Sequence, residues 1–192
     1  YQYENGLMDL PLPCLSGAHQ ITNAGTAIAL AQALDVSEAA IAKGLKTAHW
    51  PARLQKLTKG PLVAHIARQN PQGQLWLDGG HNEAAAKALA DWLGGMDSGP
   101  VHMIIGLLNT KAHEAYLAAL APSGAHMHCV PIEGNDNALP PTILAETAAQ
   151  IGMQAQAHDS IEKALGAITA PNAFILIAGS LYLAGQVLRD NS

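Results

Sequence analysis

Short apolar runs alternate with helical patterns over residues 75–188, and this alternation constrains the fold more than any other feature. Each run is followed by a helical pattern, in the pairs 75–78 with 82–93, 101–108 with 112–120, 127–132 with 141–151, and 173–178 with 181–188. A further helix is expected over 160–168, opened by the capping-box-like Asp159-Ser160-Ile161-Glu162. Such alternation builds βαβ units, so we expect an α/β fold with a mostly parallel sheet and helices on both faces.

Residues 1–50 follow a different pattern, with two amphipathic helical stretches and at most one or two short strands before them. A boundary is expected at His49-Trp50-Pro51, because the residue before a proline is disfavoured in a helix. About 50 residues of this kind cannot close a hydrophobic core alone. We therefore predict that residues 1–50 are the edge of a larger domain and that residues 51–192 form the α/β domain.

Composition excludes several classes of protein. Ten Lys and Arg residues stand against fifteen Asp and Glu residues, which leaves no dense cationic surface for nucleic acid. The apolar runs are far shorter than the roughly 20 residues of a membrane-spanning helix. Cys14 and Cys129 lack CxxC spacing and are expected to be free thiols of a cytoplasmic protein. The chain begins at Tyr1 without a secretory leader, and we expect it to be a fragment.

The most informative polar stretch is Asp78-Gly79-Gly80-His81-Asn82, between an apolar run and a helical pattern. Ligands of open parallel sheets bind beyond the carboxyl ends of the strands, where helix N-termini offer free N–H groups. Asp78 and His81 are therefore expected beside a phosphate or carboxylate. In the alternative reading, Asp78 and Asn82 only cap the helix and His81 is solvated. Replacing Asp78 or His81 by alanine is expected to leave folding nearly intact, because both are predicted at an exposed helix start.

Three further residues are candidates for ligand contacts. Ser180 follows the last apolar run and either binds a ligand oxygen or only caps the next helix, which is the commoner role. Asn23 shares a helical face with His19 and Gln20, and this face either reads a base edge or faces water. Arg53 has a planar guanidinium that suits phosphate, although a surface salt bridge is its ordinary use.

Other signals are weak or missing. His126 and His128 would share one face of a strand, but two ligands without a third partner indicate a polar strand more often than a zinc site. The sequence contains no GxxxxGK[ST] phosphate cradle. It also lacks GxGxxG, which disfavours a nicotinamide-binding Rossmann protein.

Five short motifs occur in an order and spacing that are jointly specific: Leu12-Pro13-Cys14-Leu15-Ser16-Gly17-Ala18-His19-Gln20, Trp50-Pro51-Ala52-Arg53-Leu54-Gln55, Leu77-Asp78-Gly79-Gly80-His81-Asn82, Asn137-Ala138-Leu139-Pro140-Pro141, and Gly179-Ser180-Leu181-Tyr182-Leu183-Ala184-Gly185. Together they make the chain resemble the C-terminal part of folylpolyglutamate synthase, including the bifunctional dihydrofolate synthase form, within the Mur ligase family.

The resemblance implies a Rossmann-like Mur ligase C-terminal domain over residues 51–192, preceded by a helical remnant of the central ATPase domain over residues 1–50. It implies ATP-dependent ligation of L-glutamate to folate or dihydropteroate through an acyl phosphate. In the family, the missing N-terminal ATPase domain carries the P-loop and the Mg²⁺ ligands. This chain should therefore hold no metal ligands, be inactive alone, and be a monomer when complete.

The resemblance also assigns roles to five residues. Catalytic roles fall to His81 and Asp78, nucleotide contacts to Asn23 (adenine), Arg53 (phosphates) and Asp78, and glutamate contacts to His81 and Ser180 (a carboxylate).

Two departures from the family pattern stand out. Ala52 replaces a common glycine, and Ala112 replaces the acidic residue after Lys111, which leaves the role of Lys111 open. The alternative to the ligase reading is a non-catalytic module that binds a nucleotide or an amino acid.

Overall fold

The computed structural model describes residues 1–4, 6–96, 99–109 and 112–192. The chain divides into two compact units, Tyr1–Pro51 and Ala52–Ser192. Within the described residues, no helix has both the length and the apolar character needed to cross a membrane.

The first unit is mainly helical where the structure describes it. A short antiparallel pair, β1 (Gln2–Tyr3) and β2 (Gly6–Leu7), precedes α1 (Ala18–Ala33) and α2 (Glu38–Thr47). Ser37 caps α2 by accepting a hydrogen bond from the backbone N–H of Ala40 at 3.3 Å. Ile28 and Ile41 are buried, whereas Leu30 and Leu34 are exposed, so the helices cover little apolar surface between them.

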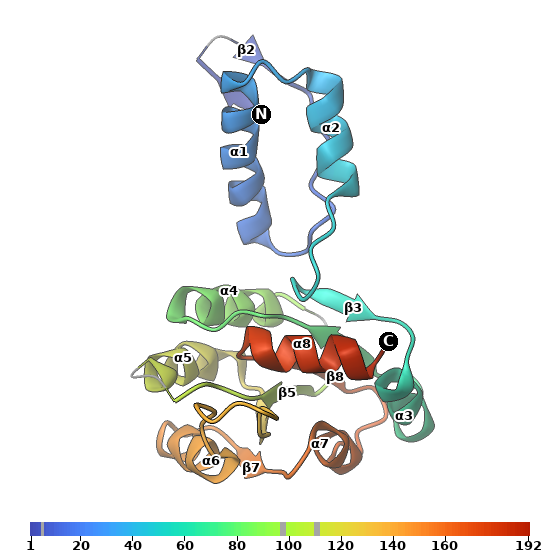
Figure 1. The fold of residues 1–192 in the computed structure, drawn as a ribbon, viewed down its shortest axis with the longest axis vertical. Coiled ribbons are helices and arrows are strands. Elements are labelled where there is room, and N and C mark those ends of the chain that lie inside the picture. The colour runs from blue at the N-terminus through green and yellow to red at the C-terminus, as the bar shows by residue number, and fades with distance from the viewer. Residues whose placement is uncertain (5, 97–98, 110–111) are drawn as a thin grey trace. The chain divides into compact units, whose positions relative to one another are not determined.

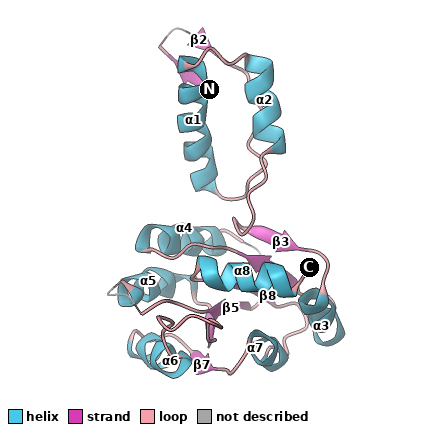
Figure 2. Ribbon diagram, in the orientation of Figure 1, coloured by secondary structure: helices cyan, strands magenta, loops and turns pink. Residues whose placement is uncertain are grey.

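The second unit is built on one sheet of six strands in the described part of the chain (Figure 2). The strands are β3 (Gln55–Leu57), β4 (Gln74–Leu77), β5 (Val101–Ile105), β6 (His126–Cys129), β7 (Ala155–Ala157) and β8 (Phe174–Ala178). Their order is β3-β4-β8-β5-β6-β7. β3 runs antiparallel to β4, and the other neighbouring strands are parallel. The predicted mostly parallel sheet is confirmed.

Helices cover both faces of this sheet (Figure 1). One face packs against α4 (Glu83–Gly94), α5 (His113–Leu120) and α6 (Pro141–Gln150), and the other packs against α3 (Pro61–Gln69), α7 (Ile161–Ala167) and α8 (Leu181–Asp190). β8 lies in the interior of the sheet and supplies both cores, with Phe174 and Leu176 on one side and Ile175 and Ile177 on the other. This two-sided burial explains its uninterrupted apolar run.

The apolar pattern misplaced some element ends. The run 101–108 was predicted as one strand, but β5 ends at Ile105, after which Leu107 and Leu108 leave the sheet. Leu107 is nevertheless buried, and its carbonyl accepts the N–H of Leu139, so apolar character alone did not mark the strand end. The edge strand β7 and the segment of β3 and α3 carried no pattern strong enough to predict them.

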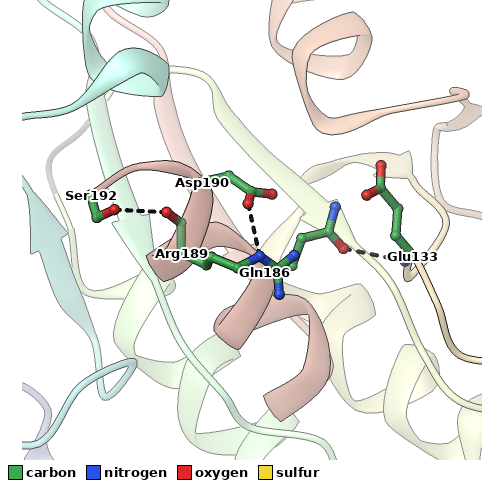
Figure 3. Close-up of polar contacts among 5 residues, drawn as sticks. All are labelled: Glu133, Gln186, Arg189, Asp190 and Ser192. Atoms are coloured by element: carbon green, nitrogen blue, oxygen red, sulfur yellow. Dashed lines mark hydrogen bonds and ion pairs between the residues drawn. The ribbon is translucent and has the colours of Figure 1, made fainter.

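Gln186, on α8, and Asn191, directly after it, join distant parts of the unit. Figure 3 shows Gln186, whose Oε1 accepts the N–H of Glu133 at 3.3 Å, and Ser192, whose hydroxyl donates to the Arg189 carbonyl at 2.8 Å. Asn191 accepts from the N–H of Leu62 and donates to the carbonyl of Lys59, both at 2.9 Å. The two Asn191 bonds tie the start of α3 to the end of the chain.

Candidate functional site

The turn between β4 and α4 lies at the carboxyl end of the parallel strands, as the sequence predicted. Asn82 caps α4 by accepting the N–H of Ala85 at 2.9 Å. A Cβ at Gly80 would lie 2.8 Å from both the Ala85 Cβ and the Asp78 Oδ1. Glycine is therefore required at this position because the neighbouring atoms leave no room for a side chain.

Asp78 is buried, with 6% of its surface exposed, so the expectation of an exposed side chain was wrong. Its Oδ2 accepts the backbone N–H of Leu54 at 2.8 Å, and its Oδ1 accepts the N–H of Gly80 at 2.7 Å. Asp78 does not cap α4, but ties the segment before β3 to the turn after β4. We call this arrangement the Asp78 tie. A direct contact between Asp78 and a ligand stays a prediction.

The Asp78 tie holds Arg53 in an unusual stretch of backbone. Ala52 and Leu54, on either side of Arg53, have φ values of 54° and 43°. Such left-handed conformations are costly for residues other than glycine and persist only when surrounding contacts impose them. Here the Gly79 N–H donates to the Ala52 carbonyl at 2.7 Å, in addition to the bond from Leu54 to Asp78. The exposed Arg53 side chain therefore projects from a rigidly held loop at the carboxyl edge.

His81 and Ser180 line one pocket of about 150 Å³. The remaining walls come from the segment after β5 and the starts of α5 and α8, among them Leu107, His113, Tyr116 and Tyr182. A pocket of this size suits a small ligand or one end of a larger one, since the pockets that bind drug-sized ligands have volumes of roughly 300–1,000 Å³. The structure thus brings together two of the predicted site residues that are about one hundred positions apart in the sequence.

His81 has a defined ring orientation. Its Nδ1 lies 3.0 Å from the Gly79 carbonyl oxygen. A carbonyl oxygen only accepts hydrogen bonds, so the proton of this contact belongs to Nδ1. The neutral ring then carries its lone pair on Nε2, which can accept a proton or hydrogen-bond a ligand.

Ser180 caps α8, which was one of the two roles that the sequence suggested for it. Its Oγ accepts the N–H of Tyr182 at 3.0 Å, and the residue is 2% exposed. The preceding Gly179 has φ 109°, and a Cβ there would lie 2.8 Å from the Gly106 carbonyl oxygen. The cap uses Oγ as an acceptor, which leaves the hydroxyl hydrogen available to a ligand oxygen in the pocket.

Asn23 lies on α1, in the first unit, and its side chain is exposed. Its Nδ2 donates to the Oε1 of Gln20 at 3.1 Å, and the Gln20 Nε2 lies 2.8 Å from the His19 Nε2. The predicted polar face of α1 is thus internally hydrogen-bonded. An adenine contact stays a prediction. Lys111 lies outside the described residues.

The sequence did not identify Tyr116, a fully buried pocket residue in the middle of α5. Its hydroxyl donates to the Gly80 carbonyl at 3.0 Å. A single tyrosine in an alanine- and leucine-rich helix was the available signal, but nothing in the sequence pairs it with a glycine 36 positions earlier.

His128, one of the two residues considered for a zinc site, joins His102 and His158 in a histidine chain on the sheet face that packs against α3, α7 and α8. The Nδ1 of His102 lies 3.0 Å from the Nε2 of His128, and the Nδ1 of His128 lies 3.0 Å from the Nε2 of His158. The His126 ring lies 5.1 Å from that of His102. In the described residues, no group of three or more His, Cys, Asp or Glu side chains is placed to hold a metal ion.

Each of the two nitrogen–nitrogen contacts in the histidine chain needs one proton, because one ring nitrogen must donate and the other must accept. Neutral His128 satisfies both by donating through one nitrogen and accepting through the other. One added proton leaves both hydrogen bonds possible, because His128 can then donate to both neighbours. A second added proton would place two N–H groups face to face and break a contact. Burial, together with the neighbouring histidines, lowers the pKa of His128 to about 4, which keeps the His128 ring neutral near pH 7.

Comparisons with known proteins agree on one family. Residues 62–190 match the family model of the dihydrofolate synthetase C-terminal domain. The chain belongs to this family. The folylpolyglutamate synthase of Lacticaseibacillus casei is 31% identical over 97% of the chain, and a probable bifunctional folylpolyglutamate synthase/dihydropteroate synthase of Halobacterium salinarum is 32% identical over 90% of it.

Solved structures of the same family share the fold. E. coli FolC in complex with DHPP and ADP superimposes with a TM-score of 0.76 at 28% identity over 95% of the chain. The bifunctional enzyme of Yersinia pestis with Mn, AMPPNP and L-glutamate bound gives a TM-score of 0.74 at 25% identity over 97% of the chain. The match confirms that this dihydrofolate synthetase C-terminal domain has the predicted Rossmann-like fold.

The chain spans part of its relatives' length. It covers 42% of the L. casei enzyme, 20% of the H. salinarum protein and 41% of E. coli FolC.

Proposed function

We propose that this chain is the C-terminal part of an ATP-dependent ligase that joins L-glutamate to folate or dihydropteroate. The observation that carries the proposal is the meeting of His81 and Ser180 in one pocket at the carboxyl edge, with the Arg53 loop tied to the same edge through Asp78. The family relatives that carry out this kind of ligation support it.

In the proposed reaction, a folate carboxylate oxygen attacks the γ-phosphorus of ATP and ADP leaves, which gives an acyl phosphate. The glutamate amine then attacks the acyl carbon to form a C–N bond. Inorganic phosphate leaves from the tetrahedral intermediate and the nitrogen loses a proton. Such chemistry depends mainly on positioning and on neutralising charge.

The residues of the second unit fit this division of labour. The exposed guanidinium of Arg53 suits a phosphate, because its planar fork bonds two oxygens at once. Asp78 holds the backbone next to Arg53 through the Leu54 N–H and is a second candidate for nucleotide contact. His81 Nε2 and the Ser180 hydroxyl hydrogen would engage glutamate, with Ser180 donating to a carboxylate. Asn23, in the first unit, would contact the adenine.

The described residues include no set placed to hold a metal ion. The Mg²⁺ that would neutralise phosphate charge, and the phosphate cradle that the sequence lacks, are assigned to the length of the relatives that this chain does not span. The chain by itself is therefore expected to be inactive.

The test is ADP release that depends on both folate and glutamate, measured for this chain and for the complete gene product that carries it. We expect turnover by the complete product alone. Turnover by this chain alone would refute the proposal that the phosphate cradle lies outside it. Absence of turnover by both proteins would refute the proposed ligase activity. Calorimetry then tests the alternative, a non-catalytic binding module. Binding of ATP or glutamate by a complete gene product that shows no turnover would support that alternative.

A further inference from the structure

Gly80, the residue before His81, has both of its backbone polar groups held by buried side chains. Its N–H donates to the Oδ1 of Asp78 at 2.7 Å, and its carbonyl accepts the hydroxyl of Tyr116 at 3.0 Å. Asp78 directly follows β4 and Tyr116 lies on α5, and the two residues are 6% and 1% exposed. The backbone that leads into His81 is therefore fixed from two sides.

The bond from Tyr116 acts directly on the peptide that carries His81. The Gly80 carbonyl and the His81 N–H belong to one planar unit, so holding the carbonyl sets the direction in which the His81 Cα leaves the turn. The His81 Nδ1 in turn contacts the Gly79 carbonyl at 3.0 Å, and that contact forms only if the Cα is correctly placed. A chain of three groups thus runs from Tyr116 through Gly80 to the imidazole.

The Tyr116 hydroxyl is a permanent hydrogen-bond donor to the Gly80 carbonyl. Burial and the nearby Asp78 carboxylate raise the pKa of Tyr116 above its ordinary value of 10, so the phenol keeps its proton at any pH at which the protein works. The ring packs among α4 and α5 residues such as Leu89 and Leu117, in the core on that face. The hydroxyl is held in place by this packing and does not depend on solvent.

We propose that Tyr116 is a positioning residue for His81, and that its hydroxyl selects the His81 tautomer with the proton on Nδ1 and the free lone pair on Nε2. The catalytic consequence rests on the proposed function. The tautomer itself is a property of this chain and holds whether or not the ligase assignment is correct.

The first measurement needs no ligand and no second protein. Two-bond ¹H–¹⁵N spectra of the wild-type chain report which ring nitrogen of each neutral histidine carries the proton, and His81→Gln identifies the His81 signals. We expect His81 in the Nδ1–H form. An unconstrained imidazole prefers the Nε2–H form, so finding that form at His81 would overturn the proposal without any variant at Tyr116.

The second measurement uses Tyr116→Phe, which removes the hydroxyl and keeps the ring in the core. The His81 signals are expected to shift toward the Nε2–H form. Tyr3→Phe, in the first unit, is the matched control and should leave them unchanged. A Tyr116→Phe protein that is folded and has wild-type His81 signals would refute the positioning role.

In the complete ligase, Tyr116→Phe should lower kcat by roughly 10- to 100-fold, the range expected for a displaced reacting group. The KM for ATP should stay near the wild-type value, and the pH profile of kcat should move. Unchanged kcat with the His81 tautomer altered would refute the catalytic role of His81 positioning. Absence of turnover in the wild type, with the tautomer as expected, would count against the proposed function alone.

Discussion

The Asp78 tie and the histidine chain are two polar clusters on one sheet, and they are satisfied in different ways. Asp78 accepts from the backbone N–H groups of Leu54 and Gly80, which donate under all conditions. The histidine chain joins side chains to side chains, and each contact depends on how many protons the rings carry. The comparison shows that the candidate site is held by backbone donors that do not change with pH. The hydrogen bonds of the histidine chain, in contrast, depend on the protonation state of its rings.

The largest effect is expected from breaking the Asp78 tie. Asp78→Ala leaves two backbone N–H groups without an acceptor, at roughly 1–3 kcal/mol each, so the free energy of unfolding should fall by about 4 kcal/mol. Urea denaturation measures this loss. His81→Ala removes an exposed side chain from the same turn and should change the free energy of unfolding by less than about 0.5 kcal/mol. A loss below about 1 kcal/mol for Asp78→Ala would mean that water replaces the carboxylate.

The histidine chain should make stability depend on pH. The pKa of His128 is about 4 in the folded chain and about 6.5 when unfolded, so the unfolded state binds more protons between these values. The stabilisation is fully present above pH 6.5 and is lost as the pH falls toward 4, by about 2 kcal/mol after allowance for solvent screening.

Denaturation followed by fluorescence checks this, because Trp76 and Trp92 pack together in the same unit with ring centroids 5.2 Å apart. His128→Leu should flatten the pH dependence, and the exposed His49→Leu should leave it as in the wild type. If the free energy of unfolding changes equally with pH in the wild type and in His128→Leu, the histidine chain is not the cause of the pH dependence.

Two serine caps sharpen the comparison, since one lies in each region. Ser180 caps α8 in the pocket, and Ser160 caps α7 two residues after His158. Replacing either by alanine should cost about 1 kcal/mol of folding free energy. In the complete ligase, Ser180→Ala should also raise the KM for glutamate roughly 10-fold, the cost of one hydrogen bond to a charged group. An equal rise with Ser160→Ala would show that the effect is structural.

The smallest change in stability is expected at Arg53. Its side chain is exposed, so Arg53→Ala and Arg53→Lys should each change the free energy of unfolding by less than about 0.5 kcal/mol. Arg53→Ala should weaken ATP binding roughly 10-fold, and Arg53→Lys should recover part of this because it keeps the charge but not the fork. Calorimetry with the complete gene product measures both. Wild-type affinity in Arg53→Ala would separate the loop from nucleotide binding.

Much of the candidate site could be predicted because its signals are local. The turn Asp78-Gly79-Gly80-His81-Asn82 predicted a strand end and a helix cap, and the structure confirms the place of both. The burial of Asp78 was not predicted, since its partner Leu54 is 24 positions away and is held in a left-handed conformation that sequence does not reveal. Tyr116 was not predicted for the same reason, because its partner Gly80 is 36 positions away in the sequence.

The sequence by itself determined the α/β class, the mostly parallel sheet and the helices on both faces, because burial on two faces imposes continuous apolar strands and periodic helices. Tertiary structure decided which polar groups meet. Asp78 bonds to Leu54 and Tyr116 bonds to Gly80. His102 of β5, His128 of β6 and His158, which follows β7, join in a chain. All of these contacts are between segments far apart in sequence. Periodicity reports which face a residue takes, whereas hydrogen-bond partners depend on how those faces are brought together.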